Sequence, residues 1–487
     1  MELKQPKPLY MLFMLEIWER YGYYSLQTII LYSIFHLYLD LSLNDAAIYF
    51  GAFFALIFGL VFIGGYIGDK ILGAKRTIVL GLIVLGLGYL FLSLAPYLAE
   101  YSNIEPKILV FIGLAIVCTG SGLFKANPSN LLSRCYEKND PRLRSGFTLF
   151  YMSINCGSVI ADFCAPIIAK AFGWNIAMFL CFIGLIFALS TFFFFKHTLV
   201  NVSTEAGQQK LTINNILKAG LITCLLFIIS IFVIFNPLYA LAVEVIAIIC
   251  CISFYLFKLF QEADTVAKRK MLVALILIIE AIAFFILYAQ KSSSINAYAI
   301  QNVDPTLFGL TFNPQSFQAL NPFWIIVLSP FLAKLYIGLE KRNKKLSFAT
   351  KFSTGLTLTS LAFFILYFSH FFANASYEVS AWWIVLIYLF FSLSELLVSA
   401  LGLAMISDLV NEQIRGTVMG MWFLATAVAG SVGGYVAAYI IPSEHLDKSQ
   451  SLVAYGDASL KLTVIMLGLS IITWSLVPFL KRLNPNK

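Results

Sequence analysis

Long apolar stretches recur from one end of this 487-residue chain to the other. A helix that crosses a bilayer needs about 20 mostly apolar residues, and fourteen stretches of the sequence meet that requirement. Because 60% of the residues are hydrophobic and only 12% are charged, too few polar side chains remain to cover a soluble globule. The sequence therefore predicts an all-α polytopic membrane protein. Its fourteen helices are expected near residues 11–38, 46–69, 77–98, 106–133, 143–171, 174–195, 213–235, 238–260, 270–296, 320–340, 348–372, 379–408, 414–441 and 458–481.

Basic residues mark every second connection between these stretches. After the second stretch, for example, the chain carries Lys70, Lys75 and Arg76. The opposite connections hold few basic residues, among them Lys107, Lys291 and Lys448. Cytoplasmic loops carry such an excess of Lys and Arg, so both termini are predicted to face the cytoplasm. These loops account for the net charge of +8, and we expect no nucleic-acid partner.

The seventh and eighth stretches form an insert between two groups of six. A polar segment at 201–210 precedes them, and the short turn FNPLY at 235–239 joins them. We predict an N-terminal six-helix bundle at 1–198, a linker with a transmembrane hairpin at 199–266, and a C-terminal six-helix bundle at 267–487. This arrangement resembles the major facilitator fold, in which two halves rock around a central site.

The first apolar stretch contains EIWERYGYYS at residues 16–25, with two carboxylates and an arginine. A charge at mid-membrane costs at least about 2.5–3.5 kcal/mol, so these groups need partners. Glu16 and Arg20 are four residues apart and share a helix face, which Tyr23 and Tyr24 continue, with Glu19 beside it. We expect this polar stripe to face an interior cavity.

Lys125 is the next charge within an apolar stretch, in GSGLFKANPSN at 120–130. An isolated buried lysine tends to lose its proton, and the carboxylates of the first helix are available partners. Two interpretations remain open. The charges form either a static cluster that fixes helix packing or a switch, in which protonation of a glutamate takes away the partner of Lys125.

Glu395 lies in FSLSELLVSALGLA at 391–404, a stretch without a basic residue. It is either a neutral, hydrogen-bonded acid or a carboxylate that awaits a cationic ligand. Glu280 and Asp162 also lie in apolar stretches, and the sequence assigns them no partner. Four other polar or amphipathic residues within spans, taken singly, suit helix packing better than ligand binding: Asn155, Gln290, Asn321 and Trp422.

Enzyme and metal-site patterns are missing from the sequence. The four His are dispersed, the eight Cys form no CxxC pair, and neither HExxH nor GxSxG occurs. The loops are too short to hold a catalytic or sensory domain. We therefore expect neither an enzyme nor a bound metal or cofactor.

Seven motifs follow one another along the chain. They are EIWERYGYYS, GGYIGDKILGAKRT (64–77), GSGLFKAN, FYMSINCG (150–157), ALNPFWIIVLSP (319–330), SELLVSALGL (394–403) and GMWFLATAVAG (420–430). In this order they resemble the motifs of the proton-dependent oligopeptide transporters, a family of the major facilitator superfamily. The first is similar to the family's ExxERFxYYG, the third to its GxGxFKPN and the fourth to its FYMxIN. The two-helix insert is typical of bacterial members.

The resemblance implies a role for each matching residue. Glu16, Glu19, Arg20 and Lys125 would form a proton-linked network, and Arg20 and Lys125 would attract the peptide carboxylate. Glu395 would meet the peptide amino terminus. The other substrate-binding residues that it implies are Tyr23, Tyr24, Asn155, Phe285, Gln290, Asn321, Ser399 and Trp422. Its conformational loop motif comprises Gly65, Asp69, Lys75 and Arg76.

Two departures from the family pattern occur together. Many members carry an Arg at the position of Gln27 and a Glu at that of Ala289, and the two pair across the halves; here both are uncharged. The segment FFILYAQKSSSINAYAIQNV at 284–303 instead resembles the di- and tripeptide permease branch. Phe58 stands where many members have a pocket tyrosine. The latch between the halves must therefore differ from that of other members.

The resemblance predicts a proton-coupled symporter that imports di- and tripeptides across a bacterial inner membrane by alternating access. Its partners would be short peptides, protons and membrane lipid, and one chain would suffice for transport. The alternative is a facilitator of another small substrate, such as a peptidomimetic drug, nitrate or another zwitterion. Competition separates the two, because excess dipeptide should block uptake and free amino acids should not.

Overall fold

A computed structural model describes residues 4–137, 140, 142–200, 202–342, 344 and 346–483. The outer ends of the predicted bundles, residues 1 and 487, lie outside the described residues. Almost all of the described chain is helical, and thirteen helices are long and apolar enough to cross a membrane. The first helix is long enough as well, but carries Glu16, Glu19 and Arg20 at its middle. With it, the described helices match the fourteen predicted spans.

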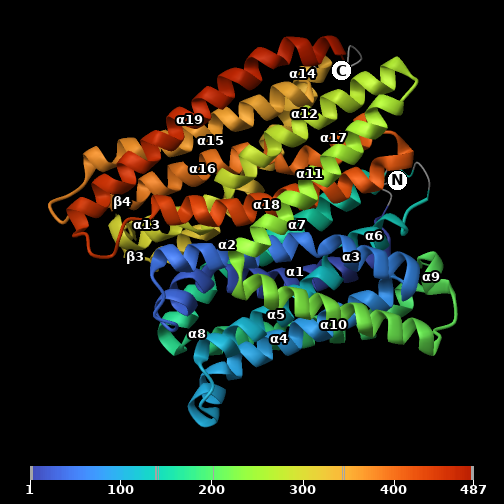
Figure 1. Ribbon diagram of the computed structural model, residues 1–487, viewed down its shortest axis with the longest axis horizontal. Helices are drawn as coiled ribbons and strands as arrows, with labels where there is room; N and C mark the ends of the chain where they lie inside the picture. Colours follow the sequence, from blue (N-terminus) through green and yellow to red (C-terminus); the bar gives the residue numbers. More distant parts are fainter. Residues whose placement is uncertain are drawn as a thin grey trace. The chain divides into compact units, whose positions relative to one another are not determined.

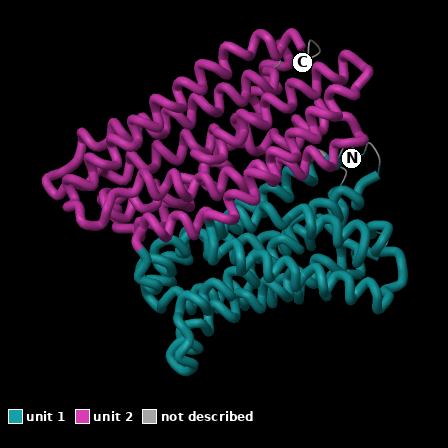
Figure 2. Tube along the Cα trace, viewed as in Figure 1, with its two compact units in different colours: residues 1–41, 52–237 teal, residues 42–51, 238–487 magenta. Residues whose placement is uncertain are grey.

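Contacts divide the chain into two compact units, shown in Figure 2. Unit 1 comprises Met1–Leu41 and Ala52–Pro237, and unit 2 comprises Ser42–Gly51 and Leu238–Lys487. The division falls in the turn of the predicted hairpin, so each unit contains one helix of the insert. The three-part division drawn from the sequence stays a prediction.

Unit 1 is a bundle of helices in which α1 packs against α7 and α8, and α4 packs against α5 and α8. Figure 1 labels its elements, whose bounds are α1 Lys7–Ile29, η1 Ile30–His36, α2 Leu43–Gly59, α3 Val61–Tyr66, η2 Ile67–Ile71, α4 Ala74–Ser102, α5 Pro106–Lys125, α6 Asn127–Ser133, α7 Arg142–Phe172, α8 Trp174–Phe195, η3 Lys196–Leu199, α9 Glu205–Gln208 and α10 Ile213–Phe235. Helix α2 begins within unit 2 and ends in unit 1.

Unit 2 has its core between α12, α15, α16, α18 and α19. Its helices are α11 Pro237–Gln261, α12 Thr265–Tyr288, η4 Ala289–Ser292, α13 Ser294–Asn302, η5 Pro314–Ala319, α14 Leu320–Lys341, α15 Phe348–Ser369, η6 His370–Phe372, α16 Ala381–Leu397, η7 Ser399–Leu401, α17 Gly402–Leu409, α18 Glu412–Ile440 and α19 Lys448–Leu483. Two minimal sheets lie in its loops: β1 (Val303–Asp304) pairs in parallel with β4 (Val379–Ser380), and β2 (Thr306–Leu307) pairs antiparallel with β3 (Leu310–Thr311).

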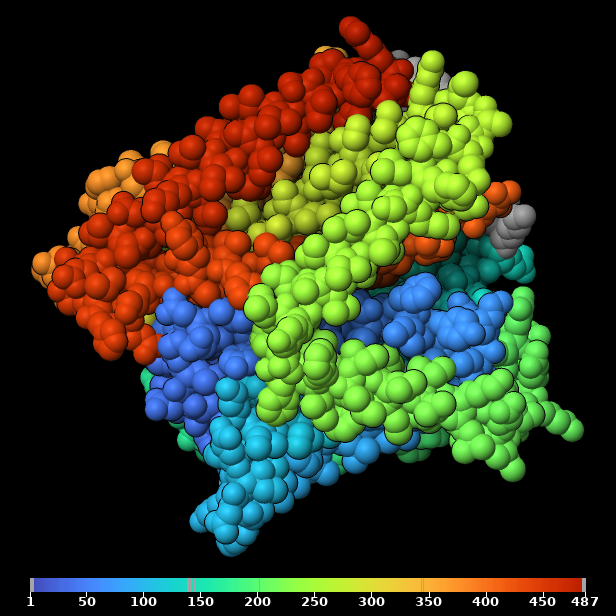
Figure 3. All heavy atoms as spheres, viewed as in Figure 1, coloured from blue at the N-terminus to red at the C-terminus, as the bar shows by residue number. Residues whose placement is uncertain are grey.

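The two helices of the insert lie on the outside of their units. In Figure 3 both are visible along the face turned to the viewer. Only 17% of an 18-residue apolar stretch in each is buried within the structure. Helix α10 packs on α5 through Phe235 and Phe111, whose ring centroids are 5.0 Å apart. Helix α11 packs on α18 through Ile248, Ala425 and Val428. Their remaining apolar surface is suited to lipid.

Three spans are interrupted near charged side chains. Helix α5 ends at Lys125 and α6 resumes at Asn127, with Pro128, which lacks a backbone N–H, in its first turn. Helix α12 passes through η4 into α13, and α16 passes through η7 into α17. Irregular backbone at membrane depth is tolerated where protein or a water-filled cavity surrounds it. The interruptions therefore identify the part of each unit where a polar site can be built.

The last helix begins ten residues before the predicted span, at Lys448 instead of 458. Its first turns are polar, so hydropathy does not detect them. Their partners come from elsewhere in unit 2: the Ser451 hydroxyl donates to Asn302 Oδ1 over 3.0 Å, and the Tyr455 hydroxyl to Gln301 Oε1 over 2.7 Å. Tertiary hydrogen bonds thus extend this helix.

Candidate functional site

The predicted ionic cluster forms on α1. Arg20 Nη2 lies 2.6 Å from Glu16 Oε1, and Arg20 Nε donates to the same oxygen over 2.7 Å. Arg20 Nε also lies 3.2 Å from Glu19 Oε2. Glu16 and Glu19 are 1% exposed and Arg20 is 8% exposed. Two carboxylates share one guanidinium, so the triad carries a net negative charge when both are ionised.

Part of this triad has no hydrogen bond. Within the described chain, Glu16 Oε2 and both oxygens of Glu19 are buried without a hydrogen-bonding partner. Burial of a carboxylate oxygen without a hydrogen-bond donor costs free energy when the group is ionised. The triad therefore contains three carboxylate oxygens that no donor among the described residues satisfies.

Lys125 does not pair with these carboxylates. Its Nζ lies 3.9 Å from the centroid of the Tyr23 ring and 4.8 Å from that of Phe58. Among the described residues, no carboxylate lies within 4.0 Å of this ammonium group. The predicted direct pairing is therefore wrong for this conformation, and two aromatic faces take the place of the carboxylate. Phe58, which has no hydroxyl, contributes to the site as a cation–π partner.

Helix α7 approaches α1 closely enough to complete this part of unit 1. An added Cβ at Gly157 would lie 2.7 Å from the Ile17 carbonyl oxygen and 2.9 Å from Arg20 Cβ. Two residues earlier, Asn155 is 5% exposed, and its amide donates to the Tyr151 carbonyl over 3.0 Å. The Tyr23 and Tyr24 rings lie edge to face with centroids 4.9 Å apart. The predicted residues of unit 1 thus gather along α1 and the elements around it.

The structure supplies partners for one of the two acids that the sequence left unassigned. Asp162 on α7 accepts hydrogen bonds from the Thr28 hydroxyl of α1 and, over 3.0 Å, from the Ser158 hydroxyl. Glu280 on α12 is 7% exposed, and neither of its oxygens has a hydrogen bond within the described chain. Asp162 thus links α1 to α7.

Asn321 is the centre of the site in unit 2. Its Nδ2 donates to Glu395 Oε2 over 2.9 Å and to the Ser392 hydroxyl over 3.0 Å. Its Oδ1 accepts from Lys291 Nζ over 2.6 Å and from the Tyr288 hydroxyl over 3.3 Å. An amide side chain offers two donors and two acceptor positions, and all four are used. Asn321 therefore connects a cation to a carboxylate with its orientation fixed.

Lys291 is a buried charged residue of this site that the sequence analysis does not single out. The charge pattern places it in an outer loop, but it is 8% exposed and lies in η4, where its ammonium group faces Asn321. Its Nζ also lies 4.6 Å from the centroid of the Tyr288 ring. One signal was available, because Lys291 falls inside the predicted span 270–296.

The amide of Gln290 hydrogen-bonds to protein groups of unit 2. It is fully buried, and its Nε2 donates to the carbonyls of Ile286 and Gly433 over 3.0 and 2.9 Å. Its Oε1 accepts from the Ser294 hydroxyl over 2.8 Å. Protein partners occupy the whole amide, so Gln290 links η4 to α18 in this conformation, and its predicted place among the substrate-binding residues stays a prediction.

The predicted aromatic residues of unit 2 meet one another. Phe285 and Trp422 lie edge to face with centroids 5.5 Å apart, and Trp422 is 4% exposed. An added Cβ at Gly402 would lie 2.0 Å from the Trp422 ring, so the indole packs on the start of α17. Ser399 is half-buried in η7, four residues beyond Glu395. Phe285 and Trp422 thus form an apolar cluster on elements next to those that carry Lys291, Asn321 and Glu395.

The side chains of the loop motif in unit 1 hydrogen-bond to α6, to η3 and to the residues just before α4. Asp69 accepts from Asn130 Nδ2 over 2.8 Å, and Lys75 Nζ donates to the Leu199 carbonyl over 2.5 Å. Arg76 Nη1 donates to the Leu72 carbonyl over 3.1 Å. At Gly65 an added Cβ would lie 3.4 Å from Ala126, whereas at Gly64 it would lie 2.0 Å from the Gly122 carbonyl oxygen. The closest helix approach is therefore at Gly64.

Thr204 completes the loop motif and was not singled out from the sequence. Its side chain is buried, its hydroxyl donates to the Gly68 carbonyl over 3.0 Å, and the Ala74 N–H donates to that hydroxyl over 3.1 Å. The hydroxyl thus joins the Gly68 carbonyl of η2 to the first N–H of α4, a helix that follows Gly73 with φ +88°. Thr204 is at least 130 residues from its partners Gly68 and Ala74 in the sequence, so the pattern of neighbouring residues does not predict the contact.

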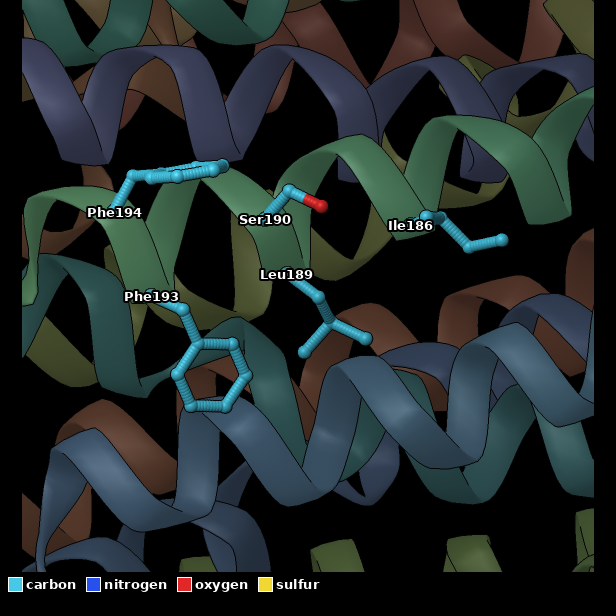
Figure 4. Close-up of a pocket in the computed structure, with 5 residues that line it drawn as sticks. All are labelled: Ile186, Leu189, Ser190, Phe193 and Phe194. Carbon is cyan, nitrogen blue, oxygen red and sulfur yellow. The ribbon is translucent and has the colours of Figure 1, made fainter.

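A hollow of about 390 Å³ on α8 does not belong to this chemistry. It is lined by Ile186, Leu189, Ser190, Phe193 and Phe194, which Figure 4 shows along one side of the helix. None of these side chains is ionisable, so the hollow cannot bind the charged ends of a zwitterion. No group of three metal-ligating side chains was found among the described residues.

Comparison with known proteins identifies relatives over the whole chain. The model of the POT family matches residues 75–451. Dipeptide and tripeptide permease B of Yersinia enterocolitica is 43% identical over 483 residues, covering 99% of this chain and 96% of the relative. That of Salmonella typhimurium is also 43% identical, over 486 residues, with the same coverage.

Solved structures of similar architecture cover the chain equally well. A crystal structure of tetrameric PepTSo2 has a TM-score of 0.84 and 31% identity and covers 98% of this chain and 99% of its own. A bacterial homologue of the human drug peptide transporters PepT1 and PepT2 has a TM-score of 0.82 and 30% identity with the same coverage. These likenesses extend to both units.

Proposed function

Because the chain belongs to the POT family, we propose that it imports dipeptides and tripeptides together with protons across a bacterial inner membrane. It has the major facilitator fold and is a transporter and not an enzyme. We further propose that a single chain is the transporting unit and that the N-terminal bundle, the linker with its hairpin and the C-terminal bundle are its three parts.

One observation carries the proposal: unit 1 contains buried cations that can bind the carboxylate of a zwitterion, and unit 2 contains a carboxylate that can bind its ammonium group. Unit 1 presents Arg20 and Lys125, whose charges suit the carboxylate of a peptide. Unit 2 presents Glu395, which is partly buried and receives a hydrogen bond from Asn321. A carboxylate whose orientation is fixed by an amide donor suits a peptide ammonium group. Asn155, Tyr23, Tyr24, Phe285, Ser399 and Trp422 would then contact the rest of the peptide.

The triad on α1 would couple proton entry to peptide binding. Protonation of Glu16 or Glu19 removes one of the two charges that compensate Arg20, because both carboxylates lie next to that guanidinium. The cation would then be free to attract the peptide carboxylate. We propose this role for Arg20 in place of Lys125, because the two carboxylates lie next to Arg20. Release of the proton on the cytoplasmic side would restore the triad and weaken the hold on the peptide.

The available energy is sufficient for uphill transport. One charge that crosses about 100 mV supplies roughly 2.3 kcal/mol. At about 1.4 kcal/mol per tenfold, this sustains a gradient on the order of 50-fold for a peptide without net charge.

Uptake by purified protein in liposomes tests the proposal. Labelled dialanine, trialanine and tetraalanine are offered with and without an inward proton gradient. We expect dialanine and trialanine to accumulate only with the gradient and tetraalanine not to accumulate. Equal accumulation without a gradient would contradict proton coupling, and failure of excess dialanine to block uptake of either peptide would contradict the substrate class.

A further inference from the structure

Lys291 is a buried cation that the proposed peptide cycle leaves without a task. It is 8% exposed, follows α12 directly, and is oriented by a hydrogen bond of 2.6 Å to Asn321 and by the Tyr288 ring. The Tyr388 hydroxyl fixes the same residue through its backbone, donating to the Lys291 carbonyl over 2.8 Å. Contacts to both its ammonium group and its backbone therefore fix the position of the Lys291 charge.

The position of Lys291 is defined relative to Glu395. One amide group, that of Asn321, separates the two, with its oxygen toward the ammonium and its nitrogen toward the carboxylate. Asn321 cannot turn over without facing a donor with a donor and an acceptor with an acceptor. The cation therefore stays one amide away from the place where a peptide ammonium would bind.

The charges of Lys291 and Glu395 determine which additional charge on a ligand is favourable at this site. Lys291 and Glu395 compensate each other when no peptide is bound. A peptide ammonium at Glu395 adds a second positive charge to a region of low dielectric, where charge pairs interact more strongly than in water. The peptide's own terminal carboxylate lies at the other end of the molecule. The group that can restore neutrality is a side chain on the first residue, since it leaves the same Cα as the ammonium group.

We propose that Lys291, oriented by Asn321 and Tyr288, forms a subsite for an acidic side chain on the first residue of the peptide. Aspartate or glutamate at that position gains a partner there, and lysine or arginine meets a like charge. The subsite discriminates among peptides by the side chain of their first residue. Other contacts would recognise the side chain of the second residue. This inference rests on the proposed peptide transport and adds the class of substrate that the carrier prefers.

Competition for dialanine uptake tests the subsite. Unlabelled Asp-Ala, Ala-Asp and Lys-Ala are titrated against labelled dialanine in proteoliposomes, and half-inhibiting concentrations are compared within each variant. In the wild type we expect Asp-Ala to compete about tenfold better than Lys-Ala, a difference of about 1.4 kcal/mol. Ala-Asp should compete less well than Asp-Ala, because its acid is on the second residue.

Variants of Lys291 separate this role from a purely structural one. Lys291→Met should bring the ratio of Asp-Ala to Lys-Ala close to one, and Lys291→Arg should keep it. Lys351→Met is the matched control: Lys351 Nζ also lies over a tyrosine ring, 4.4 Å from the centroid of Tyr336, but on α15. It should leave the ratio unchanged.

Three results would overturn the inference: no preference for Asp-Ala in the wild type, a ratio that Lys291→Met leaves in place, or an equal change in Lys351→Met. The wild-type preference decides the matter even if Lys291→Met does not fold. Absence of dialanine uptake by the wild type would instead contradict the proposed function.

Discussion

The two units bury charge in different ways. In unit 1, Arg20 contacts two carboxylates of its own helix, at 2.6 and 3.2 Å. In unit 2, Lys291 and Glu395 belong to different elements, and Asn321 on a third element joins them. The first arrangement depends on one helix and on the spacing of its residues. The second depends on tertiary packing.

This difference indicates a division of tasks. A cation with two direct carboxylate partners responds strongly when one of them takes a proton, because the charge balance of the whole triad changes. A carboxylate held through an amide keeps its direction and is suited to recognise a ligand. We therefore assign proton coupling to unit 1 and recognition of the amino end of the peptide to unit 2.

Removal of each cation should break this comparison most visibly. Arg20→Met leaves two buried carboxylates without their cation, and loss of one partner of a buried pair costs about 3–5 kcal/mol. Lys291→Met leaves Asn321 Oδ1 with the Tyr288 hydroxyl, so its cost should be nearer 1–2 kcal/mol. Thermal unfolding in detergent measures both. Equal losses of stability in the two variants would show that Arg20 is bound no more strongly to Glu16 and Glu19 than Lys291 is to Asn321.

Replacement of the Glu395 carboxylate should weaken peptide binding more than it lowers the stability of the protein. Glu395→Gln can still accept from Asn321 but offers no charge to a peptide ammonium. Hydrogen bonds to charged groups contribute about 1.5–3 kcal/mol, so the KM for dialanine should rise by about 10- to 100-fold. The control is Glu378→Gln, since Glu378 is a partly exposed acid of the same unit, 2.5 Å from Lys448. An unchanged KM in Glu395→Gln would remove unit 2 from recognition.

Close packing differs between the units as well, and a methyl group can detect it. An added Cβ would lie 2.0 Å from a backbone oxygen at Gly64 and 2.0 Å from the Trp422 ring at Gly402. Gly64→Ala should cost about 1–3 kcal/mol, as overpacking does, and Gly402→Ala should cost less, because a ring can pivot. Gly220→Ala and Gly416→Ala are controls, with nothing within 4 Å of the added atom. A larger loss at Gly402 would reverse this order.

Sequence reasoning succeeded where the physical cause is local. Hydropathy located the spans because each must cross the bilayer by itself, and the four-residue spacing of Glu16 and Arg20 placed them on one face. It failed where the partner is distant. Lys291 was read as a loop residue because its partner Asn321 lies thirty residues further along the chain.

Lys125 shows the same limit in another form. Charge alone suggested a carboxylate partner, but its ammonium group lies over the rings of Tyr23 and Phe58. Gln290 matched a family position, yet packing against Gly433 uses its amide. Which of several possible partners a buried group takes is decided by the approach of neighbouring helices, which the periodicity of a single segment does not contain.

The most direct test of the division of tasks is peptide accumulation by a variant in which both Glu16 and Glu19 are replaced by Gln. Gln keeps the shape and a hydrogen-bond acceptor for Arg20 but cannot bind and release a proton. In proteoliposomes with an inward proton gradient, we expect the variant to bring labelled dialanine only to the outside concentration while still exchanging it against unlabelled peptide. Accumulation above the outside concentration would contradict the account.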